Sequence, residues 1–343
     1  MAVKEPELLC IGNALVDVFA RAERDACFGL SRPVQHIGIE KLKEILSALC
    51  GSCTVSGGGA ANVAKIAGLL GTKVSFVGAV GTAEGAASEM RGSTPDRFAQ
   101  LFEKELAGAG VKLRLSLKPA PTGICLYLKT GSETRIAASP SASLELSEND
   151  IPEDLLEKAA IVVIDGFMLD RPALVRHILR MTERRGNISS LDLGSAALAR
   201  EHAGEILDYS RQYPLILFMN EAEAAAFCDE QKINDQEIYT FFRSLTAGKS
   251  FPVIVVKLGK QGAVCFAGGN IHRAETQAVT PMEATGAGDA FSAAFLSAWV
   301  RDRPLQECAA LGNSTARIVL DAVGTKVNGN QLEDIAKLLL REN

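Results

Sequence analysis

The sequence has 343 residues, of which 47% are hydrophobic and 22% are charged, and its formal net charge is −5. This balance is that of a globular protein and excludes a largely disordered chain. The acidic excess argues against nucleic acid or an anionic membrane as the main partner, because both require a basic surface.

Eight cysteines are too few for a scaffold that depends on disulfides. Cys50 and Cys53 have the spacing of a redox or metal pair, but no second Cys or His pair lies near them, which favours two ordinary cysteines between a helix and a strand. The N-terminal residues MAVKEPELLC are too charged for a signal peptide, and no apolar run approaches the roughly 18 residues of a membrane span. We therefore expect a cytoplasmic protein.

Short apolar runs alternate along the chain with segments of helical periodicity. Strands are expected at residues 8–11, 74–77, 161–165, 188–193, 215–219 and 253–258. Helices are expected at residues 40–49, 60–70, 96–108, 172–185, 221–228, 234–247, 287–300, 305–321 and 331–341. The strand runs often lack polar alternation, as strands covered on both faces do. This pattern predicts an α/β fold with a doubly wound, mainly parallel sheet, and we expect residues 1–343 to form a single domain.

Two stretches depart from this alternation. Residues 111–138 contain no helical pattern and alternate with a period of two, which predicts an antiparallel hairpin outside the main sheet. Residues 13–36 are expected to add a further strand to it. The two segments predict a small accessory β-sheet that acts as a lid and excludes water from a site. A surface arm used only for dimer contact is the alternative, and both a monomer and a homodimer through this sheet are compatible with the sequence.

The most specific segment is Thr-Gly-Ala-Gly-Asp-Ala-Phe at residues 285–291, which lies at the entrance of an apolar helix. The free amides of a first helical turn form an anion site, and Gly286 and Gly288 let a ligand approach the backbone closely. A carboxylate beside a bound phosphate is repelled by it, so Asp289 is interpreted as a base that takes the proton of an attacking hydroxyl. The alternative is a first-turn charge that complements the helix dipole.

A second glycine-rich segment, Ser-Gly-Gly-Gly-Ala-Ala-Asn, occupies residues 56–62 and precedes another apolar helix. Bare backbone there leaves room for a polyhydroxylated ligand, and Asn62 offers both a donor and an acceptor to hydroxyl groups. Tight packing of a turn against a helix is the alternative.

These two segments resemble the signatures of the PfkB-type, ribokinase-like carbohydrate kinases, a family that includes adenosine kinases, and the resemblance covers nearly the whole chain from about residue 8 to 327. It implies a ribokinase-like fold and an ATP-dependent phosphotransferase with an alcohol group as acceptor. Asp289 then matches the general base, and the anion hole matches Gly286, Ala287 and Gly288. The resemblance places the acceptor hydroxyls on Asn13, Asp17, Gly58, Gly59 and Asn62.

The resemblance also implies a nucleotide side. Asn220 and Glu223 match an amide and a carboxylate that organise Mg²⁺ and its waters near the phosphates, with Glu223 as the metal residue. Lys257, Gly259 and Gly262 match the loop beside the nucleotide, and Asn313 matches a residue near the adenine. Each of these assignments has a structural alternative. Asn220 and Glu223 would then form a helix capping box. Lys257 would be a solvated charge on a hairpin, and the Asn313 side chain would form a hydrogen bond between two helices.

Three positions depart from the family pattern. Glu283 stands where an Asp commonly helps to build a monovalent-cation site, which leaves a potassium requirement open. The segment at 78–85 lacks an Asp that often follows its second Gly, and Ala60 stands where ribokinases tend to carry Lys.

Rival classes fit less well. Residues 247–250 contain Gly-Lys-Ser, but Arg243 occupies the place of the first glycine of a P-loop. The first strand leads into Gly-Asn-Ala-Leu, which lacks the turn of a dinucleotide-binding oxidoreductase. We expect a kinase of a small sugar hydroxymethyl group, because aromatic side chains for a purine are scarce around the predicted lid, with Phe19, Phe28 and Tyr127 as the candidates. The alternatives are an adenosine or other nucleoside kinase and a non-catalytic ligand-binding relative.

Overall fold

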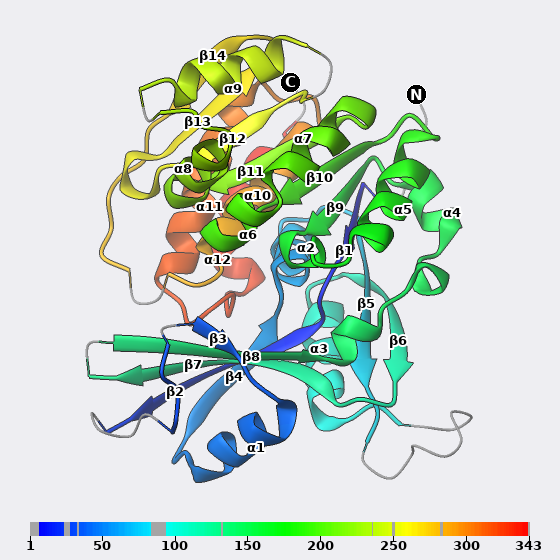
Figure 1. The fold of residues 1–343 in the computed structure, drawn as a ribbon, viewed down its shortest axis with the longest axis vertical. Coiled ribbons are helices and arrows are strands. Elements are labelled where there is room, and N and C mark those ends of the chain that lie inside the picture. The colour runs from blue at the N-terminus through cyan, green and yellow to red at the C-terminus, as the bar shows by residue number, and fades with distance from the viewer. Residues whose placement is uncertain are drawn as a thin grey trace.

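The structure is a computed structural model that describes residues 7–23, 28–32, 34–83, 94–131, 133–234, 236–248, 251–281 and 284–341. Its strands form two sheets, one of nine strands and one of five. The larger sheet is sandwiched between helices, and the smaller sheet lies across the end of it (Figure 1).

The larger sheet is mainly parallel. Across the sheet its strands follow the order β14 (Asn270–Ala274), β13 (Ala263–Ala267), β12 (Ile254–Lys257), β11 (Leu215–Asn220), β10 (Ile188–Asp192), β9 (Ile161–Asp165), β1 (Leu8–Ile11), β5 (Val74–Gly81) and β6 (Lys112–Lys118). Only the pairs β12–β13 and β13–β14 are antiparallel. The strand order reverses between β1 and β9, because β5 and β6 extend the sheet on one side of β1 and β9 to β12 extend it on the other. In doubly wound sheets, ligands bind beyond the carboxyl ends of the strands at such a point. The predicted doubly wound α/β fold is therefore confirmed.

Helices cover both faces of this sheet because its strands are apolar on both sides. Side chains such as Cys10 and Phe218 join one core cluster, whereas their neighbours Leu9 and Leu217 join the other. The first cluster is covered by α2 (Gly59–Leu69), α3 (Arg97–Gly108), α10 (Ala287–Trp299), α11 (Leu305–Leu320) and α12 (Gly329–Leu340). The second is covered by α4 (Glu153–Lys158), α5 (Pro172–Glu183), α6 (Ala196–Glu201), α7 (Ala203–Gln212), α8 (Glu221–Glu230) and α9 (Ile238–Ala247).

The second sheet has one apolar face and one mixed face. Its strands follow the order β3 (Val34–His36), β8 (Glu133–Ser141), β7 (Thr122–Thr130), β2 (Leu15–Ala22) and β4 (Ser52–Gly57). Val16, Val18, Ile124 and Leu126 pack on one face with α1 (Ile39–Ala48). The alternate residues, which include Asp17, therefore lie on the opposite face.

One boundary of the predicted accessory sheet is wrong. Residues 112–118 form β6, which pairs in parallel with β5 at the edge of the main sheet, so the hairpin of the second sheet begins only at Thr122. An edge strand with one solvated face alternates polar and apolar residues as a hairpin strand does, which explains the error. The strand expected beside Cys53, for which the sequence analysis gives no bounds, is β4, and its pairing with β2 places Gly57 in this sheet.

Candidate active site

Asp17 lies on β2 and points into a space that glycine leaves open. Its side chain is only 4% exposed. A Cβ built on Gly57, which lies diagonally across from it on β4, would lie 2.3 Å from the carboxylate carbon of Asp17. Burial, with a smaller effect from Asp289 that outweighs the opposing Lys65, raises the pKa of Asp17 to about 7. The carboxyl is thus held against bare backbone at the junction of the second sheet and α2.

The glycine turn that follows packs against the end of β1. Gly58 has φ +102°, and a Cβ on it would meet the backbone oxygen of Asn13 at 2.1 Å. Asn13 is fixed in turn, because its Oδ1 accepts from Nη2 of Arg171 at 2.8 Å and its amide donates to Asp165 at 3.4 Å. The structure therefore brings the predicted acceptor residues Asn13, Asp17 and Gly58 together at the switch point of the main sheet, with Gly59 as the first residue of α2.

Asn62 connects this group to Asp289. Its Nδ2 donates to Asp289 Oδ2 at 2.8 Å, and its Oδ1 accepts from the Thr325 hydroxyl at 2.9 Å. The amide predicted to serve ligand hydroxyls is thus largely occupied by protein partners. In this structure Asn62 orients Asp289 and retains one N–H for a ligand.

Asp289 lies in the first turn of α10, which follows a glycine, Gly286, with a left-handed backbone conformation. Gly286 caps the helix with φ +84°, and a Cβ there would lie 2.7 Å from Cγ2 of Thr325. Burial, reinforced chiefly by Asp192, raises the pKa of Asp289 to about 7, although Asn62 and Lys257 oppose the shift. The Ala287 amide already donates to the Ala284 carbonyl at 3.3 Å. A ligand anion at this turn would therefore depend on groups beyond the Ala287 amide.

The buried core fixes the direction of α10. Phe291 and Phe295 on this helix pack edge-to-face against Phe218 of β11, with ring centroids 6.5 and 5.3 Å away. All three rings are buried. Because these contacts anchor the second and third turns, the backbone of Gly288 and the carboxyl of Asp289 in the first turn have a defined place at the carboxyl end of the sheet.

Asn220 and Glu223 form a reciprocal cap at the start of α8. The Glu223 amide donates to Asn220 Oδ1 at 2.9 Å, while the amide and Nδ2 of Asn220 donate to the two carboxylate oxygens of Glu223 at 2.9 and 2.8 Å. The structural alternative is thus realised for this pair. Glu223 is 4% exposed, and burial followed by Asp192 raises its pKa.

Lys257, at the end of β12, lies directly beside the α10 turn. Its Nζ forms an ion pair with Asp192 at 2.6 Å and would be 3.3 Å from a Cβ on Gly288. The Ser292 hydroxyl lies 2.9 Å from the same Asp192 oxygen. Lys257 is therefore a paired cation with a side chain only 13% exposed, rather than a solvated hairpin charge.

The remaining predicted nucleotide residues lie around the end of β14. Gly262 has φ +89°, and a Cβ on it would meet the Ala274 carbonyl oxygen at 2.0 Å. The Asn313 side chain donates to that same carbonyl at 2.9 Å. Asn313 thus ties α11 to β14, whereas Gly259 faces open space with φ +54°.

Sequence reasoning missed Asp165, Asp192 and Thr325. The two aspartates end β9 and β10, so they lie at the carboxyl edge beside Asn13 and Lys257 respectively. Both could have been predicted, because a polar residue at the carboxyl end of a buried parallel strand indicates a ligand site in this type of sheet. Thr325 could not have been predicted in this way, because its hydrogen bond joins it to Asn62, which is distant in the sequence.

Other observations bound the site. Glu283 and residues 84–85 lie outside the described residues. No helix in the described ranges is both long and apolar enough to cross a bilayer. Within the same ranges, no group of three or more His, Cys, Asp or Glu side chains is arranged to hold a metal ion.

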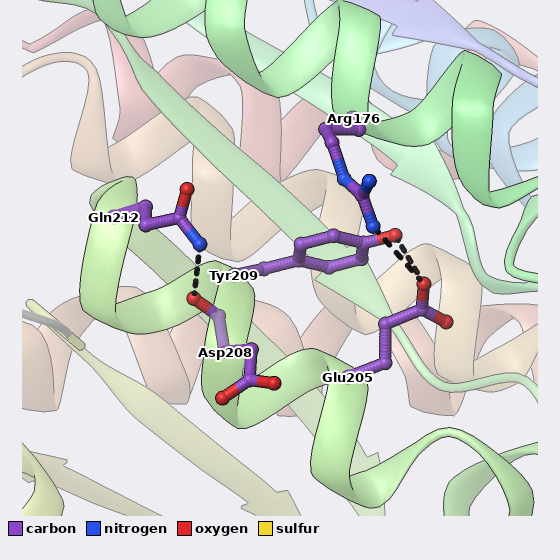
Figure 2. Close-up of a pocket in the computed structure, with 5 residues that line it drawn as sticks. All are labelled: Arg176, Glu205, Asp208, Tyr209 and Gln212. Atoms are coloured by element: carbon purple, nitrogen blue, oxygen red, sulfur yellow. Dashed lines mark hydrogen bonds and ion pairs between the residues drawn. The ribbon is translucent and has the colours of Figure 1, made fainter.

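A surface cavity of about 480 Å³ lies elsewhere, between α5 and α7 (Figure 2). Its polar groups satisfy one another: the Tyr209 hydroxyl donates to Glu205 at 2.7 Å, and Arg176 lies 3.9 Å from the same carboxylate oxygen. None of the residues that line it belongs to the cluster around Asp289.

Comparison with known proteins agrees with the fold and the motifs. The family profile described as "pfkB family carbohydrate kinase" matches residues 8–331. Adenosine kinase 2 of Arabidopsis thaliana is 24% identical over 257 residues, which cover 70% of this chain and 73% of the relative. A ribokinase of the same plant is 24% identical over 97% of this chain and 81% of its own length. The crystal structure of an adenosine kinase from Sinorhizobium meliloti superposes with a TM-score of 0.83 at 23% identity, covering 98% of this chain and all of that one.

The α/β fold, the glycine turns and these matches define an enzyme that phosphorylates sugars or nucleosides. The chain belongs to the PfkB family of carbohydrate kinases.

Proposed function

We propose that this kinase transfers the γ-phosphoryl group of MgATP to the hydroxymethyl group of a nucleoside. The observation that favours a nucleoside is an aromatic pair on the second sheet. The rings of Phe19 and Tyr127 stack with centroids 4.7 Å apart and planes 10° from parallel. The sequence alone favours a plain carbohydrate, because aromatic side chains are scarce around the predicted lid, but the fold brings two of the three candidate aromatic residues together.

The aromatic pair belongs to the face of the sheet that carries Asp17. In the parallel pairing of β2 and β7, Asp17 aligns with Cys125 and Phe19 with Tyr127, and the opposite face is the apolar face under α1. Burial, followed by the negative charge of Asp17, raises the pKa of Tyr127. A flat base against these rings and ribose hydroxyls at Asp17 would use both features of this face.

The chemistry follows from Asp289. The acceptor oxygen attacks the γ-phosphorus, the bond from that phosphorus to the β,γ-bridging oxygen breaks, and ADP leaves. Asp289 Oδ1 or Oδ2 accepts the hydroxyl proton as the new bond forms. Asn62 holds the carboxylate in place through its bond to Oδ2.

Mg²⁺ fits the Asn220–Glu223 cap through water. Both carboxylate oxygens of Glu223 already accept hydrogen bonds from Asn220. Mg²⁺ keeps several waters and is commonly held by one or two carboxylates with substrate phosphates, so a preformed cage is not required. We place the metal between Glu223 and the phosphates, where it would neutralise their charge. We also propose a cytoplasmic setting, and either a monomer or a homodimer that forms through the second sheet.

The acceptor class is tested by initial rates of ADP formation with adenosine, cytidine, ribose, fructose and a keto-deoxy sugar acid. We expect kcat/KM for the better nucleoside to exceed that of each sugar by more than about tenfold, since base stacking contributes roughly 1–3 kcal/mol. A sugar that outpaces both nucleosides would contradict the nucleoside assignment. ADP formation that needs no acceptor would contradict kinase function itself.

Phe19→Ala is expected to raise the KM for the nucleoside by roughly 5- to 100-fold, because it removes the stacking surface, while the KM for ATP stays constant. Phe98→Ala is the matched control, since Phe98 packs with the apolar cluster on the opposite face of the second sheet. Equal effects of the two substitutions on the nucleoside KM would show that the loss is structural.

The pH dependence of turnover follows from Asp289. Its pKa of about 7 means that the carboxyl is protonated and unable to accept a proton below that pH. We expect kcat/KM for the acceptor to rise with pH and to level off above about 7. Asp17 titrates in the same range and interacts with Asp289, so the apparent pKa values belong to the pair. A rate independent of pH between 5.5 and 8 would contradict this assignment.

A further inference from the structure

The side chain of Lys257 places a cation directly beside the proposed phosphoryl-transfer turn. The nearest atom to a Cβ built on Gly288 is Lys257 Nζ, at 3.3 Å. The ammonium therefore occupies the space above the first turn of α10. The Ala287 amide in that turn is already engaged with Ala284, so the backbone alone supplies an incomplete set of donors.

The position of this ammonium is fixed by two direct contacts and by a third residue that holds one of its partners. Nζ pairs with Asp192 Oδ2 at 2.6 Å, and the ring of Phe218 lies beneath it with the centroid 5.9 Å away. The Ser292 hydroxyl lies 2.9 Å from the same Asp192 oxygen and 3.1 Å from the Gly288 carbonyl oxygen. Asp192 thus links the lysine of β12 to the first turn of α10. Of the three N–H donors on the ammonium, this ion pair uses one.

The charges around Lys257 keep it protonated. Burial lowers its pKa, but the Asp192 carboxylate, together with Glu223 and Asp289, raises the pKa by more. The charges of three acidic side chains therefore favour the protonated form of this one cation. An incoming phosphoryl group would meet repulsion from these carboxylates unless a positive charge lay between them and the group.

We propose, on the basis of the function proposed above, that Lys257 is a catalytic residue that binds the migrating phosphoryl group over Gly288, and that Asp192 and Ser292 are its positioning residues. The two remaining N–H groups of Lys257 donate to equatorial oxygens of the γ-phosphoryl group as the bond to the bridging oxygen breaks and the bond to the acceptor oxygen forms. No proton leaves the ammonium in this step. The charge it neutralises is greatest at the transition state, so its effect falls on kcat more than on binding.

The test compares Lys257→Met, Lys257→Arg, Asp192→Asn and the double variant Lys257→Met/Asp192→Asn. Lys257→Met is expected to lower kcat by roughly 10²- to 10³-fold with the KM for ATP within about threefold, because a fixed donor aimed at transition-state charge is lost. Lys257→Arg should recover part of this loss. Asp192→Asn alone should lower kcat about tenfold. The double variant should have the same kcat as Lys257→Met, since Asp192 acts only through the lysine.

A binding measurement separates this role from a structural one. The affinity for MgADP is measured by calorimetry with and without aluminium fluoride, a mimic of the migrating phosphoryl group, in the presence of adenosine. Aluminium fluoride should tighten MgADP binding to the wild type at least about tenfold and leave binding to Lys257→Met unchanged. Lys337→Met is the matched control, because Lys337 forms a 2.7 Å ion pair with Glu333 on the exposed face of α12.

The outcomes are distinct. A Lys257→Met enzyme that keeps kcat within threefold, or that keeps the tightening by aluminium fluoride, would overturn the inference and leave the proposed kinase function standing. A wild type that phosphorylates no nucleoside or sugar would overturn the proposed function, and the inference with it. If Lys257→Met fails to fold because Asp192 loses its partner, the double variant, which removes both charges, gives the same two readouts.

Discussion

Replacement of Asp289 by Asn is expected to lower kcat by roughly 10²- to 10⁴-fold, because the substitution removes the only proton acceptor of the proposed reaction while keeping the shape of the side chain. ATP and the nucleoside should still bind, since the contacts of Asn13, Asp17 and Gly58 are untouched. Steady-state rates of ADP formation give kcat, and calorimetry gives the two dissociation constants. Binding that weakens as much as turnover would assign Asp289 to ligand binding rather than to proton transfer.

The alternative role of Asp289, a charge that stabilises the start of α10, predicts the opposite effect on stability. Burial raises the pKa of Asp289, which means that the folded protein disfavours its charged form. The Asp289→Asn protein is therefore expected to unfold at pH 8 at a temperature no lower than the wild type. Glu153→Gln serves as the control for a helix-dipole charge, because Glu153 is an exposed first-turn residue of α4. A clear drop in melting temperature for Asp289→Asn alone would favour the dipole role.

The second large effect is expected from Gly58→Ala. An alanine at φ +102° is strained, and its Cβ would lie 2.1 Å from the Asn13 backbone oxygen, so the end of β1 must move. A displacement of this size at a positioned substrate can cost about 100-fold in rate. We expect kcat/KM for the acceptor to fall at least about 100-fold while the affinity for ATP stays the same.

Gly71→Ala separates the effect of backbone strain at positive φ from the effect of a steric clash of the new Cβ. Gly71 lies just beyond the opposite end of α2 with φ +82°, and a Cβ there meets no atom within 4 Å. This variant should lose about 1 kcal/mol of stability and keep its activity. If both alanines reduce kcat/KM equally, the effect of Gly58→Ala comes from general destabilisation.

The layered fold follows from the sequence because apolar runs such as β9 and β11 have no polar alternation and must be covered on both faces. The strand that the sequence assigned to the wrong sheet, β6, has one solvated face. Its alternation of lysine, arginine and leucine is the same as that of an antiparallel edge strand. Local pattern does not specify which sheet such a strand joins. That assignment depends on its pairing with β5, which is settled by tertiary packing.

The site was predictable where backbone geometry requires glycine. Gly58 and Gly286 have positive φ and close neighbours, so the presence of glycine at these positions itself indicates the two turns of the site. Side-chain partners were less predictable. Nothing local shows that Asn62 meets Thr325, 263 positions away, or that Lys257 pairs with Asp192 across the sheet. These contacts exist only because α2, α10 and the carboxyl ends of the strands converge.

The central claim is that Asp289 receives a hydroxyl proton beside a phosphoryl group bound over the turn at 286–288. A crystal structure with adenosine and a non-hydrolysable MgATP analogue tests it most directly. We expect the 5′-oxygen within about 3 Å of an Asp289 carboxylate oxygen and the γ-phosphate between Gly288 and Lys257. A γ-phosphate bound away from this turn, or an Asp289 carboxylate turned from the hydroxyl, would contradict it.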